Sequence, residues 1–85
     1  MKILHLVRAL NDYRAWDTVR LQEEKGHQVS LLLIQDAVLE RAPLPREVLA
    51  LREDVLARTG KTSYPMVDYD ELVRMVFDHD KVVVW

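Results

Sequence analysis

The segment Val29–Ile34 constrains the fold of this chain more than any other part of the sequence. Its residues Leu31 to Ile34 are four consecutive apolar side chains without polar alternation. Such a strand is buried on both faces, as in a parallel sheet with helices on either side. The run Lys2–Val7, interrupted only by His5, suits a buried first strand of the same sheet.

A helix is predicted between these two strands, which makes one strand–helix–strand unit. Asn11 or Asp12 can cap its first turn, and Gly26 is placed to end it. One apolar face of this helix is expected to lie on the sheet: Ala15, Trp16 and Val19.

The C-terminal third predicts another helix followed by a strand. Asp68 with Glu71 three residues later forms a start like a capping box. The helix should run to about Asp78, and Lys81–Trp85 is apolar and β-branched, which favours a final strand. The expected buried stripe of this helix is Leu72, Val73, Val76 and Phe77.

Residues 43–60 fit two structures. Pro45 can begin one long helix that ends at Gly60, and the apolar period supports this slightly better. Alternatively, Val48–Leu51 is a short strand and Asp54–Thr59 a short helix.

Composition limits the class of protein. The 85 residues form one domain, 1–85, and 49% of them are hydrophobic, yet the chain has no cysteine for a disulfide. Covering apolar surface by association with other subunits is therefore predicted.

Charge and hydropathy exclude two further classes of protein. The net charge is −2 and the basic residues are scattered, so the chain has no basic stripe that could displace counterions from phosphates, and no direct nucleic-acid binding is expected. The longest apolar stretch is far below the ~20 residues that span a bilayer, and the start lacks a signal-peptide pattern. A cytoplasmic protein is predicted.

Two sequence features give only weak evidence for a phosphate-binding loop and for a metal site. Gly60-Lys61-Thr62-Ser63 resembles the end of a phosphate-binding loop, but Val55 stands where the first glycine is required. A helix-ending glycine explains the segment better. The three histidines lack the spacing of metal ligands, so no metal and no cofactor are predicted.

Polar residues at strand ends are the best candidates for contacts. Gln35 and Asp36 follow an apolar strand, and ligands and partners of parallel sheets gather at the carboxyl ends of the strands. Asp36 can equally cap the short helix 37–41 while Gln35 satisfies a loop carbonyl. Asp54, after the next predicted strand, is interpreted as a helix cap. Trp85 can anchor an interface or pack over the last helix.

No nucleophile–base pair is evident along the chain. Ser30 lies in a predicted buried strand, and Ser63 has no histidine near it in sequence. No catalytic residues are therefore predicted.

In order and spacing, three segments resemble the DsrH/TusB family, the smallest subunit type of the DsrE-like sulfur-relay proteins. They are Leu31–Val38, Ala50–Arg58 and Val67–Tyr69 with its following helix, and Trp85 closes the pattern. The resemblance covers nearly the whole chain. It implies a single small three-layer α/β domain with a mostly parallel four- to five-stranded sheet, and it favours the strand at Val48–Leu51, which we therefore expect.

The resemblance also implies a function. Relatives are subunits of hetero-oligomers in which larger DsrE/TusD-like and DsrF/TusC-like chains carry sulfur as a cysteine persulfide. The sulfur serves tRNA wobble-uridine 2-thiolation or dissimilatory sulfur oxidation. The thiolate of a cysteine is the nucleophile in this transfer, and this chain has no cysteine. The chain therefore cannot carry the sulfur itself. A non-catalytic structural subunit is expected, with Gln35, Asp36 and Trp85 as interface residues. The alternative is a small homo-oligomeric module that binds an anionic metabolite at the strand ends.

Two departures from the family are visible. Residues 10–16 hold no cysteine, whereas some relatives have one after the first strand. Ala37 stands where relatives often have glycine after the Gln-Asp pair, so a plain helix start is expected there.

Overall fold

The computed structural model describes residues 1–40 and 48–85, and in them five strands form one parallel sheet of order β4-β3-β2-β1-β5. Along the chain the elements are β1 (Lys2–Val7), α1 (Tyr13–Glu24), β2 (Gln28–Leu33), the short 3₁₀ helix η1 (Gln35–Leu39), β3 (Val48–Leu51), α2 (Arg52–Arg58), β4 (Met66–Val67), α3 (Tyr69–Asp78) and β5 (Lys81–Val84).

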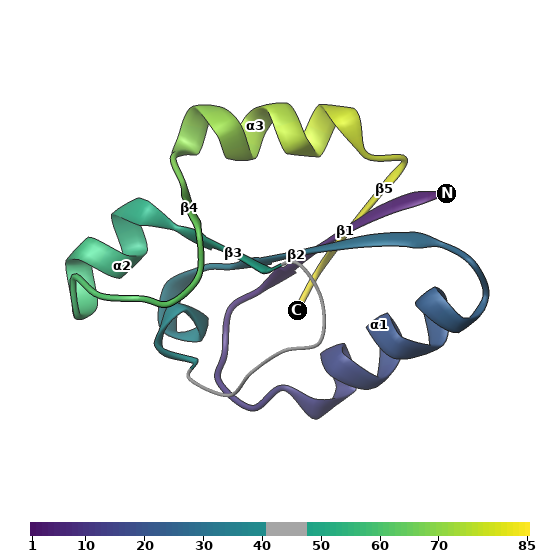
Figure 1. The fold of residues 1–85 in the computed structure, drawn as a ribbon, viewed down its shortest axis with the longest axis horizontal. Helices are drawn as coiled ribbons and strands as arrows, with labels where there is room; N and C mark the ends of the chain where they lie inside the picture. Colours follow the sequence, from purple (N-terminus) through teal and green to yellow (C-terminus); the bar gives the residue numbers. More distant parts are fainter. Residues whose placement is uncertain (41–47) are drawn as a thin grey trace.

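Helices cover both faces of this sheet. Figure 1 shows α1 on one face and α3 on the opposite face, with α2 beside the carboxyl end of β3. The central strand β2 buries Leu31, Leu32 and Leu33 completely, with alternate side chains entering the two core clusters. The predicted three-layer α/β fold is confirmed, and the absence of alternation in β2 is explained by its burial on both faces.

The first strand–helix–strand unit forms as predicted. Asp12 caps α1, because its Oδ1 accepts the backbone N–H of Ala15 at 3.2 Å. Gly26 follows the helix with φ of 87°, a left-handed conformation that glycine adopts without strain. Ala15 and Val19 are buried, and Trp16 packs against the same cluster.

Of the two structures considered for residues 43–60, the short strand followed by a short helix is confirmed for residues 48–58. β3 pairs in parallel with β2, and α2 begins directly after it at Arg52, two residues earlier than expected. Pro45, where the alternative long helix would begin, lies outside the described residues.

The buried face of α3 differs from the prediction. Asp68 caps the helix as expected, since its Oδ1 accepts the N–H of Glu71 at 2.9 Å. However, the side chains that pack against the sheet are Leu72 and Met75. Val73 and Phe77 are 51% and 84% exposed, and no residue of α3 is fully buried. The apolar residues of this helix occupy more of its circumference than one sheet face can cover.

Candidate functional site

The polar residues at the carboxyl ends of β2 and β3 meet, as the parallel sheet predicts. The Gln35 N–H donates to Asp54 Oδ2 at 2.7 Å, and Asp36 forms a 3.0 Å ion pair with Arg58 of α2. Arg58 also lies 3.8 Å from Asp54. The prediction that Asp54 caps α2 is therefore wrong. Asp54 lies within the first turn of α2 and accepts a hydrogen bond from Gln35 at the neighbouring strand end, and the N-cap residue of α2 is Leu51.

This cluster has the wrong charge for an anionic ligand. Two carboxylates, Asp36 and Asp54, surround one guanidinium, and the one donor that the backbone of Gln35 offers is taken by Asp54. Gln35 has φ of 50°, whereas Ala37 lies buried inside η1 without positive φ. The helix predicted for residues 37–41 is therefore a 3₁₀ helix that begins two residues earlier, at Gln35, and ends at Leu39. Asp36 does not cap η1, because its carboxylate turns to Arg58.

Trp85 belongs to a polar chain that joins three elements. Its indole N–H donates to Nδ1 of His5 at 2.8 Å, and Nε2 of His5 lies 2.6 Å from Oε1 of Gln22 on α1. The two ring planes are only 15° apart, with 6.0 Å between centroids, so the rings lie side by side across this hydrogen bond. Since Nδ1 accepts, the Nε2–H tautomer of neutral His5 donates to Gln22. Trp85 thus packs against its own chain, on the α1 side rather than over the last helix, and its contact with a partner stays a prediction.

Burial controls the charge of His5. The side chain is 0% exposed, and this loss of solvation lowers its pKa, against the raising effect of the Gln22 hydrogen bond and with a smaller lowering effect from Lys81. The Trp85 N–H can donate to Nδ1 only if that nitrogen carries no proton, as in a neutral imidazole. Burial of His5 favours this neutral form.

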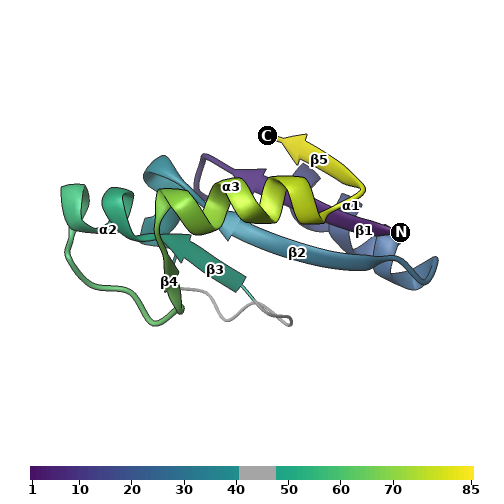
Figure 2. The same cartoon turned by 90° about the horizontal axis from the view of Figure 1, so that it is seen from above.

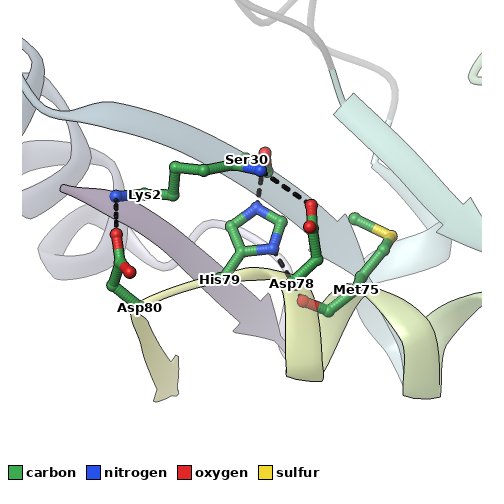
Figure 3. A network of polar contacts seen from close by, with 6 residues as sticks. All are labelled: Lys2, Ser30, Met75, Asp78, His79 and Asp80. Carbon is green, nitrogen blue, oxygen red and sulfur yellow. Dashed lines mark hydrogen bonds and ion pairs between the residues drawn. The ribbon is translucent and has the colours of Figure 1, made fainter.

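A serine–histidine pair lies on the α3 side of the sheet, near the amino ends of the strands. Nε2 of His79 is 3.0 Å from Oγ of Ser30, and its Nδ1 is 2.7 Å from the carbonyl of Met75 (Figure 3). This pair was not predicted from the sequence, because 49 residues separate the two side chains and no local spacing signals their contact. Both residues line an open cavity of about 460 Å³.

The chemistry of this pair is limited by its surroundings. A serine with a histidine base can attack an acyl group, but the developing oxyanion needs preorganised donors. The cation of the network, Lys2, is held by Asp78 at 2.7 Å, and this contact lowers the pKa of Asp78 (Figure 3). The backbone N–H of Asp80 also donates to the carbonyl of Lys2 at 2.8 Å, and the backbone N–H of Lys2 donates to Oδ2 of Asp80 at 2.7 Å. The network therefore fastens the C-terminal end of α3 to β1 and β2.

The segment that resembles a phosphate-binding loop ends a helix, as predicted. Gly60 follows α2 with φ of 70°, and its N–H donates to the carbonyl of Val55 at 2.8 Å. The next element is the short strand β4 instead of a helix, so the strand–loop–helix context of a nucleotide site is not formed.

Within residues 1–40 and 48–85, no group of three or more candidate ligand side chains could hold a metal ion. None of the helices in the described chain has the length and apolar character needed to cross a bilayer. No protein-family model and no curated protein matches the sequence.

Proposed function

We propose that this chain is a non-catalytic structural subunit of a cytoplasmic sulfur-relay complex, of the kind that supplies sulfur for tRNA 2-thiolation or for dissimilatory sulfur oxidation. The observation that carries the proposal is the combination of the parallel three-layer α/β fold with a sequence that has no cysteine. Sulfane sulfur moves between thiolates, so a chain without one can position a persulfide only on another polypeptide.

Two features of the structure support a role in assembly. The polar residues at the strand ends are engaged in internal ion pairs and hydrogen bonds, which leaves them little capacity for substrate chemistry. Meanwhile α3 leaves large apolar side chains in solvent, as expected for a protein that completes its burial by association. The partners are thiol-bearing DsrE/TusD-like and DsrF/TusC-like chains.

The test is co-expression of the tagged chain with thiol-bearing chains of this type encoded in the same genome. The partners should co-purify at fixed stoichiometry. After loading with a persulfide donor, intact-mass spectrometry should find added sulfur on the partners and none on this chain. Recovery of the chain as a free monomer beside abundant partners, or a sulfur adduct on this chain, contradicts the proposal.

The competing module for an anionic metabolite is tested by thermal shift with nucleotides and inorganic phosphate. A ligand that binds only the folded state raises its stability by about 2.7 kcal/mol at a hundred times its Kd. The net negative charge of the Asp36, Asp54 and Arg58 cluster predicts no shift from these anions.

A further inference from the structure

The hydrogen bonds of His79 fix the direction in which the Ser30 hydroxyl donates. A carbonyl oxygen only accepts, so Nδ1 of His79, 2.7 Å from the Met75 carbonyl, carries the ring proton. In a neutral imidazole Nε2 is then the acceptor, and the hydroxyl of Ser30 donates to it at 3.0 Å. Figure 3 shows the three groups in this order. A nucleophile beside a base that a third group orients is the arrangement of an activated hydroxyl.

The Ser30 hydroxyl lies in a cavity that is open to solvent. Helix α3 connects β4 at one edge of the sheet with β5 at the other, and the amino ends of β2 and β3 extend beyond the helix on one side (Figure 2). The cavity of about 460 Å³ lies between α3 and these strand ends, and both Ser30 and His79 line it. Small-molecule sites commonly have volumes of about 300–1,000 Å³. A small molecule can therefore reach the pair.

The hydroxyl of Ser30 is not used elsewhere in the described chain. Within residues 1–40 and 48–85 its hydrogen bond to His79 is its only one. A hydroxyl has one proton and two lone pairs, so the contact with His79 occupies the proton and leaves the oxygen able to attack.

The lining of the cavity indicates the class of molecule that fits. Its charged side chains are two cations and two carboxylates, so with histidine neutral their formal charge is zero: Lys2, Arg74, Glu71 and Asp78. Three of its residues belong to the apolar cluster on the α3 side of the sheet: Leu49, Val67 and Met75. An uncharged, apolar group suits this lining better than an anion or a cation.

We propose that Ser30 is an acylation site that takes a short, uncharged acyl group from an activated ester. Oγ of Ser30 attacks the carbonyl carbon of the ester, and its proton passes to Nε2 of His79. The bond between the carbonyl carbon and the leaving oxygen then breaks, and that oxygen takes the proton from His79. The products are an O-acyl serine and a free alcohol or phenol, with no change of oxidation state. The inference does not depend on the proposed function.

A single acylation is expected instead of rapid turnover. The first step expels a good leaving group, whereas release of the acyl group must expel the alkoxide of Ser30. Preorganised oxyanion donors assist such a step, but the ammonium of Lys2 is engaged by Asp78. The acyl group should therefore stay on Ser30, which is compatible with a structural subunit.

The experiment treats the full chain with p-nitrophenyl acetate and follows acetylation of each serine by mass spectrometry of tryptic peptides. Ser63 is the internal reference, because it is the only other serine of the chain and is exposed. A positioned general base accelerates a reaction by about 10²–10⁴-fold. Ser30 should therefore be acetylated about a hundredfold faster than Ser63, or more. Ser30→Ala should remove this fast acetylation.

Two histidine variants test the base. His79→Ala should lower the rate at Ser30 to about that of Ser63, and free imidazole should restore it without accelerating Ser63. Loss of the fold cannot produce this rescue. His27→Ala is the matched control, since His27 is also half-buried but does not line the cavity. It should leave the rate at Ser30 unchanged.

A longer ester tests the acyl class. With p-nitrophenyl butyrate the ratio of the two serine rates should rise, because the added methylene groups can contact the apolar lining. A ratio that falls overturns the assignment of an apolar acyl group.

Equal acetylation rates at Ser30 and Ser63 in the wild-type chain overturn the proposal, whether or not the variants fold. Fast acetylation of Ser30 in a folded His79→Ala variant also overturns it, because the hydroxyl is then not activated by this base. Far-UV circular dichroism establishes which variants fold. Neither result affects binding to thiol-bearing subunits, so the proposed function is tested separately.

Discussion

The hydrogen bond from Trp85 to His5 is a contact whose contribution to stability can be isolated by one substitution. Trp85→Phe keeps an aromatic ring at this position but removes the indole N–H that donates to Nδ1 of His5. His5 is 0% exposed, so water cannot easily replace the donor. Leaving a buried polar atom without its partner costs about 1–3 kcal/mol. We expect the free energy of unfolding to fall by this amount.

Urea denaturation followed by far-UV circular dichroism measures the effect, since tryptophan fluorescence changes with the substitution itself. In a thermal melt followed by the same signal, the melting temperature should fall by roughly 4–8 °C for each kcal/mol of stability lost in a domain of this size. Trp16→Phe is the control, because Trp16 is partly buried against the same cluster and loses a similar ring area. If the two variants are destabilised equally, within about 0.5 kcal/mol, the reasoning about the buried donor is refuted.

Two further predictions concern the buried histidine and the strand-end cluster. The pKa of folded His5 lies below its ordinary 6.5, so the unfolded chain binds more protons as pH falls through 6.5 and stability decreases. His5→Phe should flatten this dependence between pH 7 and 5, where one proton contributes at most about 1.4 kcal/mol per pH unit; an unchanged slope in urea titrations contradicts it. Asp54→Ala should cost about 0.5–1.5 kcal/mol through the lost Gln35 contact, and Asp36→Ala less, because the Asp36–Arg58 pair is exposed to solvent. The reverse order in chemical denaturation would count against this assignment.

Much of the architecture was predictable because it depends on local patterns. The unalternating run in β2 required burial on both faces, Asp12 and Asp68 are side chains that cap helices, and Gly26 and Gly60 stand where φ is positive. Each of these signals acts over a few residues. The strand β3 was not decided in this way, since its apolar period also fitted a helix. Only the family resemblance favoured the correct structure there.

The candidate sites were less predictable because they join distant residues. Ser30 and His79 meet across 49 positions, and Asp54 contacts Gln35 from the next strand instead of capping its own helix. The spacing of residues along the sequence does not indicate which distant residues will come into contact. The apolar period of α3 likewise signalled a wide apolar surface without indicating how much of it the sheet would cover.

The sequence by itself determined that the chain forms a parallel α/β sheet and that it can hold no sulfur on a thiol, because burial patterns and residue chemistry are properties of the residues themselves. The tertiary structure alone decided which side chains are neutralised, which are paired, and which remain in solvent. The sheet beneath α3 covers Leu72 and Met75 and leaves Phe77 exposed. Which face of a helix is covered depends on the width and position of the elements packed against it, and these are fixed only when the whole chain has folded.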